Sequence, residues 1–132
     1  MTAFVKSHGT AERPLPDHWL AAGSRLVSPG RTRFPRRPRM APGDHLVLYA
    51  SVWRCVFGVA EVVGEPERLP DAPARWPWSV AVELLVVVPV LSNAPPIEAI
   101  GVAPRSMSQQ SHIRIEPRHL ELALEALAGV GR

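Results

Sequence analysis

The chain has 132 residues, of which 46% are apolar and 20% are charged, and its net charge is +3. These values predict a single folded domain over residues 1–132 and exclude a disordered chain. The longest apolar stretch, Val80–Leu91, contains Glu83 and Pro89 and falls short of the ~20 residues of a membrane helix. Met1–Gly9 has no signal-peptide pattern, so we expect a cytoplasmic protein that does not bind membranes.

The first part of the chain predicts one strand, one short helix and one long loop. Ala3–Ser7 is a short apolar run with a β-branched residue, which favours a strand. Asp17 is placed to cap a short helix that ends at Gly23. Ser28–Pro42 holds four prolines and five arginines without apolar periodicity, and it is therefore predicted to be a loop.

The middle of the chain predicts a hairpin followed by a long strand. His45–Ala50 and Val52–Val63 are apolar, β-rich runs joined by a tight connection, with Gly58 as a bulge position. Pro66–Pro77 is rich in proline and predicts another loop, and Ser79–Val88 predicts a central strand.

Toward the end of the chain, Pro95–Ile100 predicts one helical turn and His112–Ile115 a short strand. A helix is predicted to begin at Pro117 and to end at Gly129. Its apolar face comprises Leu120, Ala123, Leu124 and Leu127. Because strands do not alternate with long helices, we predict an α+β domain: a small, bent, mostly antiparallel β-barrel flanked by helices.

Most catalytic signatures are missing from the sequence. It contains no P-loop, no dinucleotide-binding glycine pattern and no nucleophile elbow. The histidines lack zinc-like spacing, and the single cysteine supplies no thiolate cluster, so no metal or cofactor is predicted. Ser111 and His112 are adjacent on a predicted strand, where neighbouring side chains point to opposite faces, which makes them a poor nucleophile–base pair.

Two features do predict binding. Trp76-Pro77-Trp78 places two large aromatic faces at the start of the longest strand, where they can stack a flat ligand or, alternatively, plug the end of the barrel as core. Five arginines between Arg31 and Arg39 form a basic loop that suits phosphate. A genome whose base composition favours arginine codons is the alternative explanation of that loop.

Taken in order, several segments together resemble the EVE domain, which belongs to the PUA-like superfamily with the YTH and ASCH domains. They are Phe4–Ser7, Gly43–Ala50, Phe57–Val62, Trp76–Trp78 and Gln110–Ile115. The resemblance extends over nearly the whole chain. It implies a small, bent β-barrel that binds nucleic acid and holds an extruded, modified base in an aromatic cage.

The resemblance also implies site residues. Those expected to contact the base are Ser7, His8, Ser51, Trp53, Trp76, Trp78, Gln109, Gln110, Ser111 and His112. Those expected to hold phosphate are Lys6, Arg31, Arg33, Arg36, Arg37 and Arg39. The asparagine-rich stretch of YTH domains is replaced here by His8-Gly9-Thr10, so the identity of the base stays open.

The leading hypothesis is a non-catalytic reader of modified or flipped bases in DNA or RNA, which acts alone or with a partner enzyme. One alternative is a small hydrolase of nucleosides or RNA, of the ASCH type, with Lys6 and Glu61 as its candidate groups. The other is a module that binds a small molecule or a protein.

Overall fold

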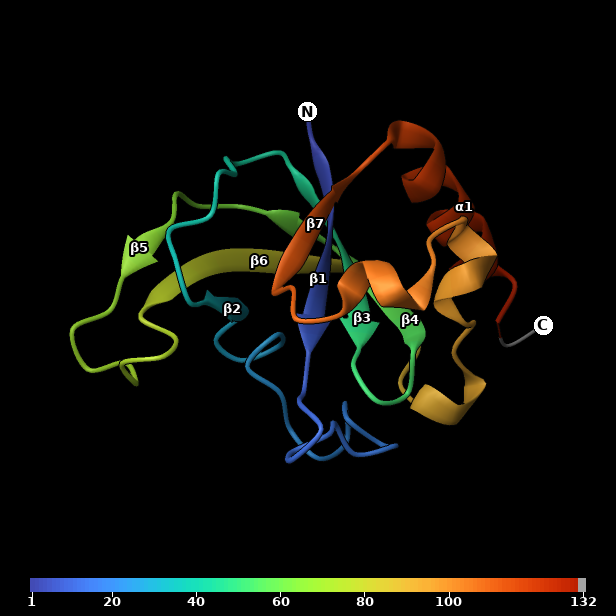
Figure 1. Cartoon of the computed structure of the whole chain (residues 1–132), viewed down its shortest axis with the longest axis horizontal. Helices are drawn as coiled ribbons and strands as arrows, with labels where there is room; N and C mark the ends of the chain where they lie inside the picture. Colours follow the sequence, from blue (N-terminus) through green and yellow to red (C-terminus); the bar gives the residue numbers. More distant parts are fainter. Residues whose placement is uncertain (131–132) are drawn as a thin grey trace.

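The computed structural model describes residues 1–130 as a curled sheet with one α-helix packed on its outer face (Figure 1). The strands are β1 (Ala3–His8), β2 (Arg31–Phe34), β3 (His45–Ala50), β4 (Cys55–Val62), β5 (Glu67–Arg68), β6 (Trp78–Val87) and β7 (His112–Ile115). The helices are η1 (Leu91–Asn93), η2 (Ile97–Ile100), η3 (Pro104–Met107), all of the 3-10 type, and α1 (Pro117–Ala128).

The sheet follows the order β2-β6-β4-β3-β1-β7, and the short β5 pairs with the start of β6 on the edge opposite β2. The pairs are antiparallel, as predicted, except that β1 and β3 run parallel. The curl brings the two end strands together. The ring centres of Phe34 on β2 and His112 on β7 lie only 5.1 Å apart. A bond of 3.2 Å between His8 Nε2 and Thr32 Oγ1 also joins β1 to β2. The sheet is therefore strongly curled, with side-chain contacts between its two ends, and we call it a half-barrel.

Alternation along β3 produces two hydrophobic cores. Leu46 and Leu48 face the inside of the curl, where they pack with Phe34 and Phe57. Val47 faces the outer side, which η2 and α1 cover. Because β3 buries both of its faces, it reads as a continuous apolar run.

The predicted bulge at Gly58 is confirmed. Leu48 pairs with Gly58 and Tyr49 with Val56, which leaves Phe57 as the extra residue. A Cβ atom on Gly58 would lie 2.8 Å from the carbonyl oxygen of Val86 on β6, so the close approach of these strands requires glycine.

Four of the predicted elements differ from the structure. Pro66–Pro77 is not entirely loop, because it contains the short β5, and the strand predicted over Val52–Val63 begins only at Cys55. Ser28–Pro42 is not entirely loop, because it contains β2, in which Thr32 and Phe34 alternate with arginines and are buried. Asp17 does not cap a helix: residues 17–22 form turns. Its carboxylate instead accepts the backbone N–H and the hydroxyl of Ser92, so the side chain joins two distant loops.

The C-terminal helix α1 has the predicted bounds, with Gly129 at its C-terminus. Ala123 and Leu127 are buried against the outer face of the sheet, but Leu124 is exposed, so the predicted apolar face was one residue too wide. Within residues 1–130, no helix has the length and apolar character needed to cross a membrane.

Candidate nucleic-acid interface

Three alternate residues of β1, namely Phe4, Lys6 and His8, face the inside of the curl. The Lys6 side chain is only 3% exposed. Its amine donates to the carbonyl oxygen of Ser7 at 2.8 Å and lies 4.9 Å from the centre of the Phe34 ring. The Trp76 ring covers the same amine, at 5.6 Å. The predicted phosphate ligand Lys6 thus lies within an aromatic cage.

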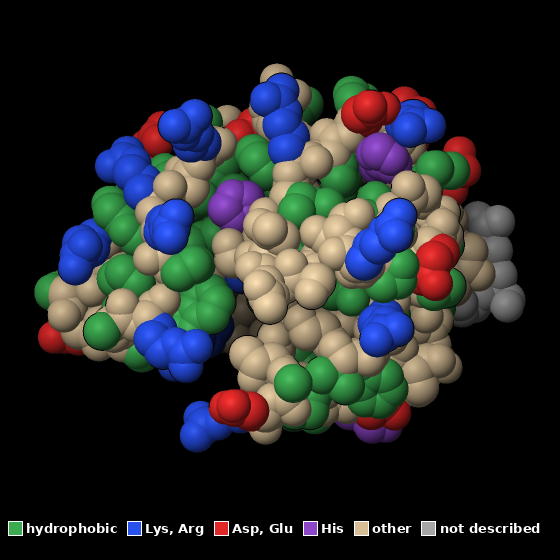
Figure 2. Space-filling model, viewed as in Figure 1, with side chains coloured by type: hydrophobic (Ala, Val, Ile, Leu, Met, Phe, Trp, Pro, Cys, Tyr) green, Lys and Arg blue, Asp and Glu red, His purple; other side chains and the backbone are tan. Residues whose placement is uncertain are grey.

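The two tryptophans of Trp76-Pro77-Trp78 are both half-buried, and Trp78 also packs against the inner core, whereas Trp76 does not. Trp78 begins β6, opposite Phe34 of β2, and Arg37 stacks over its ring at 5.4 Å. Trp76 precedes the strand and covers Lys6. The aromatic pair therefore lies where β2 ends and β6 begins, and we call this place the mouth of the half-barrel. Figure 2 shows this face hollowed near its middle, beside β2.

Two histidines flank the lysine on the inner face. His8 bonds to the Lys6 carbonyl oxygen at 3.1 Å, and burial, followed by the Lys6 charge, lowers the pKa of His8 well below 6.5. His112 pairs with Lys6 across β1 and β7, and the same two causes lower the pKa of His112. Both imidazoles are therefore neutral at pH 7.

Burial lowers the pKa of the Lys6 amine itself, from 10.5 to about 7. Among the described residues, no carboxylate forms a salt bridge with Lys6. The mouth of the half-barrel thus combines aromatic faces with two neutral imidazoles and an amine that is only partly protonated at pH 7.

The remaining residues expected to contact the base are divided between this mouth and its surroundings. Ser111 bonds to His112 Nδ1 at 2.9 Å, which corrects the expectation that these neighbours point apart. The pair meets because Ser111 precedes β7 and is free of its alternation. Gln109 and Gln110 are exposed on the same loop, and Gln109 has a positive φ of 60°.

Ser7 and Ser51 form a separate pair, with their hydroxyl oxygens 2.6 Å apart. Ser7 alternates with Lys6 and His8 on β1, so it does not share their face. Trp53, at the tip of the β3–β4 hairpin, donates its indole N–H to Leu15 and is 38% exposed. The structure therefore does not bring Ser7, Ser51 and Trp53 into the aromatic cage.

The five arginines between Arg31 and Arg39 differ in their exposure and in their hydrogen-bond partners. Arg31 is held by Ser79 at 2.6 Å and by Glu67 at 2.7 Å. Arg33 is partly buried, and its Nη1 atom lacks a hydrogen-bond partner. Arg36, Arg37 and Arg39 are exposed. Figure 2 shows the basic side chains of this face gathered mainly on the side of β2 and β5.

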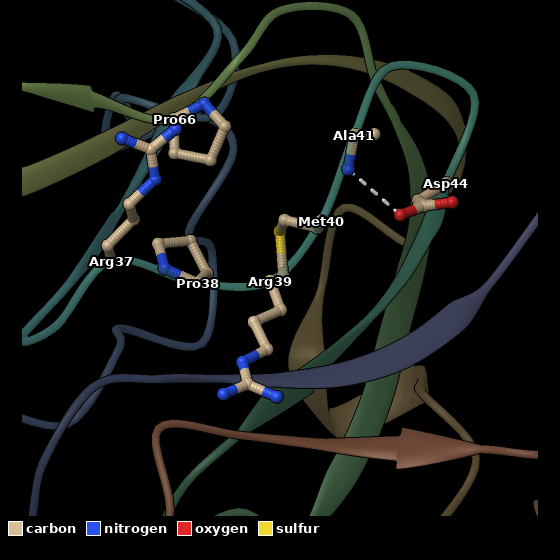
Figure 3. A pocket seen from close by; sticks show the side chains of 7 residues that line it. All are labelled: Arg37, Pro38, Arg39, Met40, Ala41, Asp44 and Pro66. Carbon is tan, nitrogen blue, oxygen red and sulfur yellow. Dashed lines mark hydrogen bonds between the residues drawn. The ribbon is translucent and has the colours of Figure 1, made fainter.

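A hollow of ≈ 460 Å³ lies beside this loop, between Arg37, Pro66, Met40 and Asp44. Figure 3 shows that Arg37 and Arg39 point away from each other, with the Arg37 guanidinium directed toward Pro66. The carboxylate of Asp44 is already occupied by the Ala41 amide at 2.9 Å. The cationic side chains that line this hollow are therefore Arg37, which also stacks on Trp78, and Arg39.

Sequence reasoning missed Phe34 and Thr32, which line the inner face beside Lys6 and His8. The signal was present, because polar and apolar residues alternate through Arg31–Phe34. The surrounding prolines and arginines outweighed it.

Comparisons with known proteins report on the fold. No family model matches the chain, and no curated protein matches it. Among solved structures, Rpa0253 from Rhodopseudomonas palustris is similar with a TM-score of 0.62 and 11% identity, covering 97% of this chain and 94% of that one.

Two further similar structures are a YTH domain and a protein bound to DNA. The MmI1 YTH domain has a TM-score of 0.58 and 10% identity, covering 95% of this chain and 94% of its own. Human THYN1, in complex with DNA containing 5-methylcytosine, has a TM-score of 0.55 and 11% identity, covering 95% and 98%. The chain therefore shares its fold with a YTH domain and with THYN1, in agreement with the fold that its sequence motifs indicated.

Proposed function

We propose that this protein is a non-catalytic module that binds nucleic acid and holds a modified or flipped base at the mouth of its half-barrel. The observation that carries the proposal is the position of Trp76 and Trp78, half-buried beside an inner face whose Lys6, His8 and His112 bear polar atoms. Aromatic faces stack bases with a free energy of ~1–3 kcal/mol per base, and polar atoms beside them read base edges.

The exposed arginines supply the second component of the proposed binding, which is contact with phosphate. Arg36, Arg37 and Arg39 lie on the loop between β2 and β3, and Arg37 stacks on Trp78. A guanidinium next to the aromatic mouth is placed to hold the phosphate next to a flipped base. The likeness to THYN1, whose solved complex contains 5-methylcytosine DNA, supports the same function.

The test is fluorescence anisotropy with oligonucleotides that differ only in one base: cytosine, 5-methylcytosine, 5-hydroxymethylcytosine, adenine or N6-methyladenine. Both DNA and RNA are used, across a salt series. We expect the affinity of wild-type protein to fall as salt rises and to favour one modification. Trp76→Ala should remove that preference, a loss of roughly 5- to 150-fold, and leave the salt-dependent binding.

The double variant Arg36→Ala, Arg37→Ala should do the opposite. Each lost phosphate contact reduces the slope of log affinity against log salt by about 1, so the double variant should lose about 2. Arg118→Ala is the matched control, because Arg118 is exposed on α1 and pairs with Glu116. Absence of binding at low salt, or a slope that Arg118→Ala changes as much as the double variant, would overturn the proposal.

A further inference from the structure

The chain uses arginine for every basic side chain except one. Of its 15 lysines and arginines, Lys6 is the only lysine. An arginine keeps its proton under all ordinary conditions, whereas a lysine amine loses it readily when buried and then becomes a nucleophile. The only lysine of this protein is thus buried at the mouth of the half-barrel, 3% exposed.

The surroundings of the amine favour its neutral form. Phe34 from β2 and Trp76 from the loop before β6 present rings to it, while His8 from β1 and His112 from β7 are the titratable groups that face it. Within residues 1–130 no carboxylate forms a salt bridge with it. With a pKa of about 7, roughly half of the molecules carry a neutral amine at pH 7, against about one in 3,000 for a lysine of pKa 10.5.

The aromatic cage also defines the shape of what reaches the amine. Phe34 is fully buried, whereas Trp76 is half-exposed and belongs to a loop, so Trp76 marks the solvent side of the amine. A ligand that enters past Trp76 meets two aromatic faces and must be flat to pack against them.

We propose that Lys6 captures an aldehyde carried on a planar ring, specifically a 5-formylpyrimidine base, as a reversible imine. The Nζ lone pair attacks the aldehyde carbon, a C–N bond forms, and one amine proton moves to the oxygen. The resulting carbinolamine loses its hydroxyl group with the second amine proton as water, which leaves a C=N bond. One amine and one aldehyde thus give one imine and one water, without oxidant or reductant. The delivery of such a base within nucleic acid rests on the proposed function.

The test uses the full chain and the free nucleoside 5-formyl-2′-deoxycytidine, with borohydride added to reduce any imine to a stable amine. Intact mass and peptide mapping then locate the adduct. Because Lys6 is the only lysine, the α-amine of Met1 is the one other primary amine and serves as an internal reference. We expect a single adduct at Lys6 whose yield rises with pH through a midpoint near 7.

Propanal, an aldehyde without a ring, is the matched control reagent. Relative to the Met1 amine, Lys6 should react with the formylpyrimidine at least about tenfold faster than with propanal, because the cage orients a flat ring. Lys6→Arg keeps the charge but should lose the adduct, and Lys6→Met serves if the arginine variant does not fold. Adducts at Met1 alone, or equal reaction with propanal, would overturn the inference. Since the assay uses a free nucleoside, its failure is distinguishable from a failure to bind oligonucleotides.

Discussion

Replacing Lys6 with methionine should remove a pH dependence of stability that the buried amine imposes. The native pKa of Lys6 is about 7, below the value of 10.5 for an exposed lysine. Between these two values the unfolded chain binds a proton that the native chain has released, so native stability rises with pH. Below the native pKa the full cost of the buried charge is present. Methionine has a similar length and no charge, and its variant should lack this rise.

The size of the effect follows from the two pKa values. One proton of difference changes the free energy of unfolding by ~1.36 kcal/mol per pH unit. Integrated with native and unfolded pKa values of about 7 and 10.5, the gain for Lys6 between pH 7 and pH 9 is about 2 kcal/mol. The half-buried His8 and His112 titrate below the interval from pH 7 to pH 9, and burial raises the pKa of Cys55 to about 11.

The assay is urea unfolding of wild-type protein and Lys6→Met at a series of pH values from about 6 to 9. Subtracting the variant's curve from the wild-type curve cancels the contribution of Cys55. The two histidines, whose pKa values the Lys6 charge lowers, titrate below the interval from pH 7 to pH 9 and so do not enter the comparison there. We expect the difference to shrink by about 2 kcal/mol as the pH rises from 7 to 9, with the variant more stable at the lower end. Two parallel curves would refute the buried, unpaired amine. Lys6→Arg is the control with a permanent charge, and it should be destabilised at every pH.

Three further predictions concern the free energy of unfolding in urea. Gly58→Ala should cost about 1–3 kcal/mol, since its Cβ would meet the Val86 oxygen at 2.8 Å. The control is Gly64→Ala, whose Cβ would lie 3.4 Å from that of Ala81, and it should change stability by less than about 0.5 kcal/mol. Equal effects of the two substitutions would contradict the close approach of the strands at Gly58. Asp44→Ala should cost about 3 kcal/mol, because two backbone amides at 2.9 Å lose their acceptor, and Asp44→Asn should cost less, since it keeps one oxygen. Trp19→Phe should cost about 2 kcal/mol through the lost 2.8 Å bond from its indole to a backbone carbonyl, and an unchanged stability would show that this bond contributes nothing.

Local patterns were sufficient wherever a segment's own residues decide its structure. His45–Ala50, His112–Ile115 and the helix from Pro117 were predicted with their observed bounds, because β-branched runs and helix-terminal residues act over a few neighbours. The bulge at Gly58 was predicted for the same reason, since an isolated glycine within a strand marks such a position.

The candidate site was predicted only in part. The tryptophans at the mouth of the half-barrel were recognisable from Trp76-Pro77-Trp78, because proline and two indoles at the start of a strand are a local signal. The position of Lys6 was not, since a single lysine before a serine carries no sign of burial. Its aromatic cage is made of residues 28 and 70 positions further along the chain, Phe34 and Trp76.

The sequence by itself determined a small, β-rich domain with an aromatic mouth and a basic loop, because composition and short-range periodicity carry that information. Only the tertiary structure decided that β1 pairs in parallel with β3, that β2 forms within the basic loop, and that Lys6 faces inward. These outcomes depend on pairing between segments far apart in the chain, and a one-residue change of register would turn Lys6 to the opposite face. Burial by partners that are distant in sequence therefore makes an ordinary lysine an amine with a pKa of about 7.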